Sequence, residues 1–163
     1  MEVINTPVSP YIQNAPIAYC ATTLESIYVD PGDEIEKLMN VSNELNLKPQ
    51  YIFITHGHID HAGGAVELAR ELDLKILGPH IDDKFLLDVL EMQGQMYGMK
   101  AENFTPEKWL NHKDSISFGN QKLEILLCPG HTPGHIIAVN HDAKKVIGGD
   151  VLFNGSIGRT DLP

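Results

Sequence analysis

The chain lacks the features that mark a membrane or secreted protein. Its 163 residues contain no apolar run approaching the roughly 20 residues that a membrane-spanning helix needs. The first ten residues have neither the basic region nor the apolar core of a secretory signal. We therefore expect a cytoplasmic protein that does not act at a membrane.

Basic residues are also scarce. Lysine and arginine number 12 against 22 aspartates and glutamates, which gives a formal charge of −10. Contacts with phosphates need clustered cations, so this balance argues against a nucleic-acid partner, although a nuclease could draw positive charge from a metal. A small-molecule substrate fits better, and nothing in the sequence indicates the oligomeric state.

Cysteine is rare too. Cys20 and Cys128 are far apart and form no CxxC pair. We interpret them as buried reduced thiols rather than as a disulfide or a pair of metal ligands.

Histidine, by contrast, is concentrated in one segment. Of the eight histidines, His56, His58 and His61 fall within six consecutive positions, and Asp60 lies among them. The segment follows an apolar predicted strand and precedes an amphipathic helix, and side chains two apart in extended backbone project to the same side. Asp60 alone could be a helix N-cap. Together, imidazole and carboxylate groups at this density favour a zinc or iron site.

Two later strands also end in candidate ligands. The predicted strand 122–128 leads to His131 and His135, and the strand 145–149 leads to Asp150. Ligand sites in layered α/β proteins gather beyond strand ends. His131 would complete a three-histidine set with an open metal position. For His135 we expect packing or hydrogen bonding, while Asp150 is either a turn residue or a carboxylate that bridges two metals.

The pattern of apolar residues predicts a single α/β domain of mixed sheets flanked by helices. Asp33 is expected to cap the first helix.

The methionine-bearing stretch 92–99 is interpreted as core, with an apolar wall for substrate as the alternative. Arg159 and Asp161 form either an ion pair that braces the Asp150 loop or a solvated surface pair. The predicted strands are 11–12, 17–22, 26–29, 50–55, 75–77, 122–128, 135–140 and 145–149, and the predicted helices are one beginning after residue 33, then 63–72 and 82–97, with an irregular segment over 94–105.

These motifs resemble the metallo-β-lactamase superfamily. The HxHxDH signature of residues 56–61, the Gly-His at His131 and the Gly-Asp at Asp150 occur in the family's order. The segments 56–64, 129–135 and 148–163 most resemble its small glyoxalase II-like (hydroxyacylglutathione hydrolase-like) branch. The resemblance implies an αβ/βα four-layer sandwich over residues 1–163.

The resemblance also implies a ligand set and a reaction. His56, His58 and His131 would bind one metal, Asp60 and His61 a second, and Asp150 would bridge both. Zinc is expected, as one or two ions, with iron or manganese as alternatives. A metal-bound hydroxide, oriented by Asp60 or Asp150, would cleave hydroxyacyl thiolesters.

Members of that branch continue beyond this point and supply a further histidine to the second metal. We therefore expect the domain to be incomplete at its C-terminus, the alternative being a weakened second site. The C-terminal region that holds glutathione in larger relatives is also absent from the sequence, which puts specificity for glutathione in question.

Three other functions fit the same residues. A mononuclear iron persulfide dioxygenase would use only His56, His58 and His131, and a lactonase would use the same nucleophile as a thiolesterase. Oxygen-reducing di-iron relatives carry glutamate where this chain has His58, which argues against that class. A metal-binding module without turnover is the alternative outside the enzymes.

Overall fold

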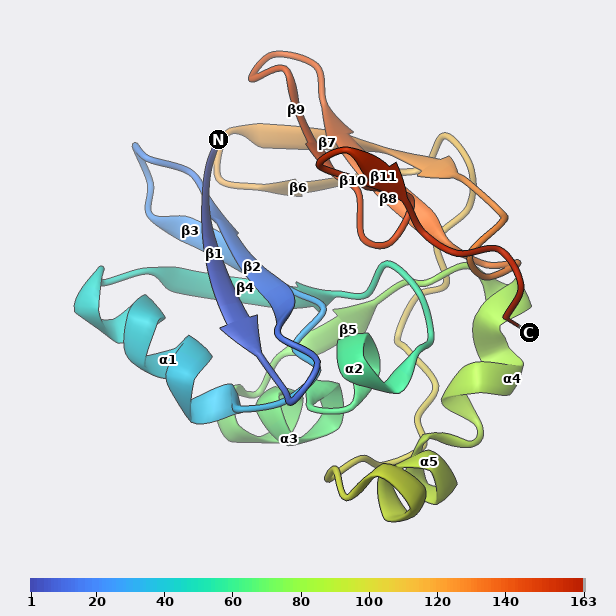
Figure 1. Ribbon diagram of the computed structural model, residues 1–163. Helices are drawn as coiled ribbons and strands as arrows, with labels where there is room; N and C mark the ends of the chain where they lie inside the picture. Colours follow the sequence, from blue (N-terminus) through green and yellow to red (C-terminus); the bar gives the residue numbers. More distant parts are fainter. Residues whose placement is uncertain (163) are drawn as a thin grey trace.

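Two β-sheets pack face to face, with helices against the outer side of the first (Figure 1). The computed structural model describes residues 1–162. The first sheet has the order β1 (Glu2–Val8), β2 (Gln13–Tyr19), β3 (Glu25–Val29), β4 (Lys48–Phe53) and β5 (Lys75–Leu77). The second has the order β6 (Ser115–Phe118), β7 (Gln121–Leu127), β8 (Ile136–Asn140) and β9 (Lys145–Ile147), and β10 (Leu152–Phe153) pairs with β11 (Ser156–Ile157).

Strand β4 lies at the centre of this arrangement. It runs parallel to both β3 and β5, and its end is buried on both faces. Tyr51 and Phe53 point into the core between the two sheets, whereas Ile52 and Ile54 point into the core beneath the helices. Because both faces of such a strand are covered, successive side chains are all apolar, which explains the sequence Tyr-Ile-Phe-Ile.

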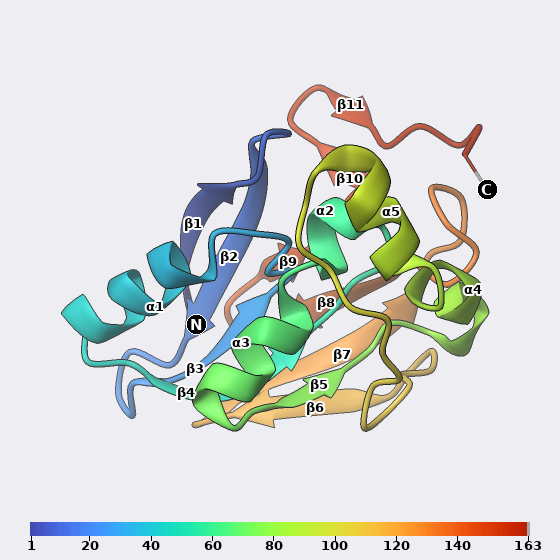
Figure 2. The same cartoon turned by 90° about the horizontal axis from the view of Figure 1, so that it is seen from below.

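Helices cover only one side of the sandwich. Figure 2 shows α1 and α3 in front of the first sheet, where Leu38 and Leu68 are fully buried. Within residues 1–162 no helix covers the outer face of the second sheet, so these residues form three layers of the expected four. The helical segments are α1 (Ile35–Glu44), α2 (Ile59–Ala62), α3 (Ala65–Leu72), the 3-10 turn η1 (Ile81–Asp83), α4 (Lys84–Leu87) and α5 (Leu90–Tyr97).

The sequence predicted the mixed α/β sandwich, and that class is confirmed. The edge strands were less well predicted. Tyr11 and Ile12 lie in the turn between β1 and β2 rather than in a strand, while β1, β6 and the β10–β11 hairpin were not predicted. The residues of β1 alternate only weakly in burial, and β10 and β11 are exposed, so their pairing leaves little trace in the hydrophobic pattern.

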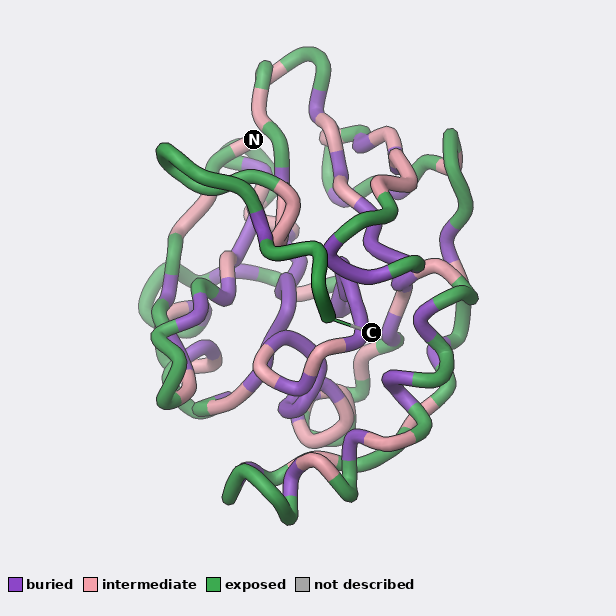
Figure 3. Tube along the Cα trace, turned by 45° about the vertical axis from the view of Figure 1, so that its right-hand side comes forward, coloured by how far each residue is buried: buried purple, intermediate pink, exposed green. Residues whose placement is uncertain are grey.

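The predicted helix over residues 82–97 is broken into η1, α4 and α5. Helix α5 includes residues 94–97, which were expected to be irregular. Its methionines were expected in the core, but Met92 and Met96 are exposed and only Met99, beyond the helix, is buried. In Figure 3 the outward side of this segment, at the bottom of the view, is largely green.

Helix α1 is not capped by an Asp33 side chain as predicted. Its N-cap is Glu34 in a left-handed conformation, without a side-chain capping bond, and Asp33 Oδ1 accepts a hydrogen bond from the Glu34 amide instead. Both cysteines are free, as expected. Cys20 is buried as predicted, but Cys128 is partly exposed, so the prediction that both are buried is wrong for Cys128. Among the described residues no helix is long and apolar enough to cross a membrane.

Replacing Phe53 by alanine tests the importance of the core between the sheets. The ring is fully buried there, so Phe53→Ala should lower the free energy of unfolding by about 3–5 kcal/mol in urea denaturation. Phe85→Ala is the matched control, since Phe85 is 45% exposed and its loss should change stability by only about 0.5 kcal/mol. Equal losses in the two variants would contradict this account of the core.

Candidate metal centre

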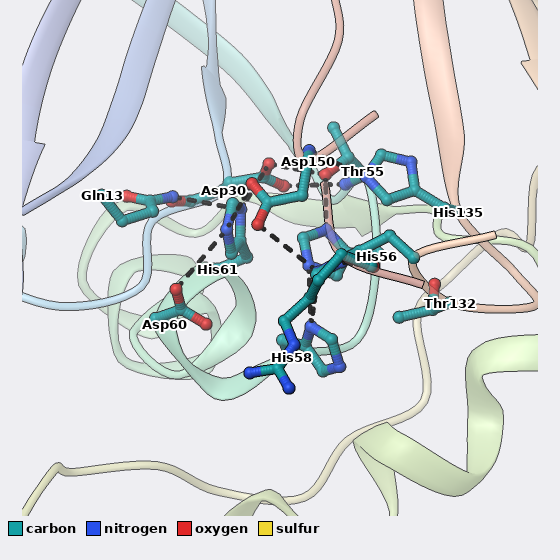
Figure 4. Close-up of polar contacts among 12 residues, drawn as sticks. Gln13, Asp30, Thr55, His56, His58, Asp60, His61, Thr132, His135 and Asp150 are labelled. Carbon is teal, nitrogen blue, oxygen red and sulfur yellow. Dashed lines mark hydrogen bonds and ion pairs between the residues drawn. The ribbon is translucent and has the colours of Figure 1, made fainter. Parts of the chain in front are cut away.

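The candidate ligands follow the ends of strands that lie close together in space. Residues 55–58 continue from β4, and Asp30 follows the neighbouring parallel strand β3. His131 follows β7 in the second sheet, and Asp150 follows β9. Figure 4 shows the side chains from these loops pointing toward one another. All six residues predicted from the sequence are therefore brought into one cluster.

Three ring nitrogens converge on one point of this cluster. His56 Nε2 lies 3.1 Å from His58 Nδ1, which lies 3.0 Å from His131 Nε2. His56 and His131 are buried, while His58 is partly exposed and faces the opening.

Asp150 connects this group of nitrogens to a second group of ligand atoms. Its Oδ2 lies 3.4 Å from His131 Nε2, and its Oδ1 lies 3.2 Å from His61 Nε2. Asp60 Oδ2 lies 3.6 Å from the same His61 nitrogen. The two oxygens of one carboxylate thus face two separate groups of potential ligands (Figure 4).

Hydrogen bonds on the far side of each ring determine which nitrogen carries a proton. His131 Nδ1 lies 2.9 Å from the Arg159 carbonyl oxygen, which can only accept, so Nδ1 donates. Thr55 Oγ1 donates its proton to Asp30, 2.6 Å away, and therefore accepts from His56 Nδ1 at 3.0 Å. When each ring is neutral, its single proton is on Nδ1 and the Nε2 lone pair is directed at the shared centre.

Burial keeps the His56 and His58 imidazoles neutral. It lowers the pKa of His56 well below the ordinary value, with further lowering from the neighbouring histidines. Burial, followed by the charge of His131, lowers the pKa of His58 to about 4. Neutral imidazole is the form that binds metals, so no proton has to be displaced from either ring near pH 7.

His61 is in a different electrostatic environment. Burial by itself would lower its pKa, but hydrogen bonds to Asp150 and Asp30 outweigh that effect and raise the pKa to about 10. Conversely, burial would raise the pKa of Asp150, but its hydrogen bond to His61 lowers it. Carboxylates therefore stabilise positive charge at this position.

The sequence analysis missed the role of Asp30. This carboxylate is buried, and its Oδ1 accepts from the Thr55 amide at 2.7 Å while its Oδ2 accepts from the Thr55 hydroxyl and lies 3.0 Å from His61 Nδ1. It forms a possible ligand group with His56 and His61. Because these hydrogen bonds already occupy both oxygens, we interpret Asp30 as orienting His61 rather than as binding a metal. Asp30 directly follows β3, the neighbour of β4, and this position at a strand end was the available signal that it belongs to the site.

Asp83 was missed as well. It is fully buried between the two histidine-bearing loops. Its Oδ2 accepts from the Gly57 amide at 2.9 Å and from the Thr132 hydroxyl at 2.7 Å, and its Oδ1 accepts from the Gly134 amide at 2.6 Å. The carboxylate therefore holds the loop after β4 against the loop after β7. Nothing in the local sequence distinguishes it from its exposed neighbour Asp82.

The other predicted residues have simpler positions. His135 Nε2 accepts a hydrogen bond from the Asp150 amide, in agreement with a supporting role. The Arg159–Asp161 pair is exposed on both sides, so it is the solvated alternative. The remaining histidines contact groups outside the cluster: His80 pairs with Asp82, His112 accepts from the Leu127 amide, and His141 pairs with Glu124.

Two glycines allow the loops to approach this closely. A side chain at Gly32 would collide with the Asp60 carbonyl of α2. Gly149 has a φ of 48° and packs against Thr55 and His135, where a Cβ would approach the His135 ring to 2.7 Å. Larger residues at either position would push apart the loops that carry the candidate ligands.

The cluster is accessible from two sides. A hollow of about 310 Å³ is bordered by His58 and Asp60. A second hollow of about 570 Å³ is bordered by Asp60, His61 and Asp150. Small molecules can therefore reach the side chains that converge here.

The donor set fits a divalent metal. Nitrogens bound to a tetrahedral zinc at about 2.0–2.1 Å are about 3.4 Å apart, a few tenths of an ångström more than the distances from His58 Nδ1 to the nitrogens of His56 and His131. The group formed by His56, His58 and His131 has its donor atoms within 4.8 Å of one another. Lone pairs directed at one point repel unless a cation or a proton lies among them.

The fold and this cluster together define a class of protein. The model of the Metallo-beta-lactamase superfamily matches residues 25–163. The chain belongs to this superfamily, whose members bind metal ions.

Within the superfamily, the chain is similar to small hydrolases. It is 39% identical over its whole length to hydroxyacylglutathione hydrolase GloC of Haemophilus influenzae and covers 77% of that protein. It is 33% identical over 96% of its length to the probable metallo-hydrolase YqgX of Bacillus subtilis and covers 74% of it.

Solved structures agree with this placement. TTHA1623 in a di-iron-bound form has a TM-score of 0.85 at 32% identity, and the match covers 98% of this chain and 78% of that one. The B3 metallo-β-lactamase BLEG-1 has a TM-score of 0.87 at 27% identity, with coverage of 99% and 78%.

The contribution of Asp83 to stability can be measured by substitution. In Asp83→Asn, either orientation of the amide places an NH2 group against at least one of the three donors, which should cost about 1–3 kcal/mol of unfolding free energy. Asp82→Asn is the control and should change it by only about 0.5 kcal/mol. Indistinguishable urea midpoints for the two variants would show that the hydrogen bonds of Asp83 do not stabilise the two loops.

The contribution of Asp30 to metal affinity is a separate expectation. Asp30→Asn removes the charge behind His61, and loss of such a supporting carboxylate typically weakens metal binding about 10- to 100-fold. Competition with a chromophoric chelator measures the affinity, with Asp33→Asn as the control. If Asp30→Asn does not fold, Thr55→Val tests the same group of supporting residues, because it removes the hydroxyl that accepts a hydrogen bond from His56 Nδ1. Unchanged affinity in a folded variant would contradict this role.

Proposed function

We propose that this protein is a metal-dependent hydrolase of the glyoxalase II type, which cleaves hydroxyacyl thiolesters with the help of zinc. The observation that carries the proposal is the position of Asp150, whose two oxygens face two different groups of ligand atoms. Such a carboxylate is suited to bridging a two-metal site of the kind that hydrolases use.

In this proposal each group has a defined role. His56, His58 and His131 would hold one metal, Asp60 and His61 would hold the second, and Asp150 would be shared. A bound metal supplies an activated water at neutral pH and polarises the substrate carbonyl. Asp60 or Asp150 would also accept a hydrogen bond from that water and orient it, and a thiolate would leave without strong help from a general acid.

The electrostatics of His61 support a second cation. Three carboxylates surround this ring: Asp30 at its Nδ1, and Asp60 and Asp150 at its Nε2. In the absence of metal they stabilise a proton, as the raised pKa of His61 indicates. The same charges would favour a divalent cation, which would replace that proton on Nε2.

The relatives support hydrolysis of a thiolester over the other chemistries. Hydroxyacylglutathione hydrolase GloC is 39% identical over the whole chain. ETHE1 from Myxococcus xanthus, at 21% identity, supports the fold alone. A dioxygenase that uses only three histidines would leave the arrangement of Asp60, His61 and Asp150 without a purpose.

The test is a substrate panel on protein of known metal content. S-Lactoylglutathione and other thiolesters should be hydrolysed at least about tenfold faster than lactones, and chelator should abolish turnover until zinc, iron or manganese is restored. Oxygen uptake with glutathione persulfide should be absent. No chelator-sensitive turnover of any thiolester would contradict the proposal and favour a metal-binding module.

Asp150→Asn tests the bridging role directly. Metal content should fall from two ions per chain toward one, and kcat should fall by more than the roughly 10- to 100-fold that outer-shell changes produce. Asp142→Asn, in the exposed β8–β9 turn, is the matched control. Full metal content and activity in Asp150→Asn would rule out a bridging carboxylate.

A further inference from the structure

Large apolar side chains stand exposed around the smaller hollow beside the cluster. Tyr11 and Tyr97 are 55% and 54% exposed, although aromatic rings of this size are usually covered. Both border the hollow that His58 and Asp60 also border. In Figure 2, α5 lies beside α2, and the turn between β1 and β2 lies near both helices. An exposed apolar surface of this kind next to polar ligand atoms indicates a binding site.

The floor of this hollow is apolar. Ile59 of α2 and Leu86 of α4 are almost fully buried and form part of its wall. Gln93 of α5, partly exposed, adds a neutral side chain that can both donate and accept a hydrogen bond. No lysine or arginine is among the described residues that border it. The hollow therefore favours an uncharged, mainly apolar group with one or two hydrogen-bonding atoms.

Size and charge decide which part of a thiolester fits. At about 310 Å³ the hollow is at the lower end of small-molecule sites, which are about 300–1,000 Å³. A glutathionyl group carries two carboxylates, for which these walls offer no cation. An acyl group is small and uncharged, and its carbonyl carbon must lie at the cluster, two of whose members, His58 and Asp60, border the hollow.

We propose that this hollow binds the acyl group of the substrate, and that this group is a 2-hydroxyacyl chain with an apolar substituent, such as a phenyl ring. The proposal rests on the proposed thiolester hydrolysis. The substituent packs between Tyr97, Tyr11 and Leu86, while Gln93 is placed to bond the 2-hydroxyl. Tyr97 is thus a specificity-determining residue.

Two thiolesters that differ only in the acyl group test this. S-Mandeloylglutathione and S-lactoylglutathione share the thiol part and the 2-hydroxyl, so the ratio of their kcat/KM values reports the substituent alone. The wild-type ratio should favour mandeloyl, and Tyr97→Ala should reduce it roughly five- to tenfold through loss of aromatic contact. Met96→Ala is the matched control, because Met96 lies on the same helix, is 68% exposed and does not border the hollow.

A binding measurement separates this inference from the proposed function. Calorimetry of the metal-loaded protein with mandelate and with lactate should show tighter binding of mandelate, and Tyr97→Ala should remove the difference. If no thiolester is hydrolysed but this Tyr97-dependent preference holds, thiolester hydrolysis is wrong and the apolar acyl site stands. Thiolester hydrolysis with a ratio unchanged by Tyr97→Ala would overturn the acyl site alone. Neither turnover nor a preference in binding would overturn both.

Discussion

Hydrogen bonds on the far side of the imidazole rings are the constraint on which the centre depends. A histidine offers two nitrogens, and it binds a metal only through one that carries no proton. The Arg159 carbonyl and the Thr55 hydroxyl each accept a hydrogen bond from an Nδ1 atom, so in the neutral rings the Nε2 lone pairs of His131 and His56 face the same point. The convergence of ligands is therefore a property of their surroundings as much as of the histidines.

These supporting groups link the centre to the frame of the fold. Asp30, at the end of β3, bonds both the backbone and the side chain of Thr55 at the end of β4, and so fixes one strand end to the next. Asp83 holds the loops from the two sheets together through three hydrogen bonds. Buried carboxylates that are fully hydrogen-bonded make a rigid connection, which keeps donor atoms from separate strands within a few ångströms.

The same frame leaves the centre open toward the smaller hollow. His58 and Asp60 are partly exposed members of the cluster, and they face a hollow whose walls include the β1–β2 turn, α4 and α5. Supporting carboxylates lie behind the rings, whereas apolar side chains lie at the opening. Rigid polar support on one side and an adaptable apolar surface on the other is an arrangement suited to catalysis on small molecules.

The sequence by itself determined the class of fold and the six candidate ligands, because close spacing of histidines after apolar strands is a local signal. It also indicated that Asp150 could be shared. Only the tertiary structure showed that Asp30 and Asp83 support the centre. It also showed that Met92, Met96 and Tyr97 are exposed rather than in the core. The roles of the two carboxylates depend on contacts between segments 25 to 50 residues apart, which local sequence does not specify. The exposure of the methionines depends on which side of a short helix faces the interior, and hydrophobic periodicity in so short a helix carries too little information to predict that.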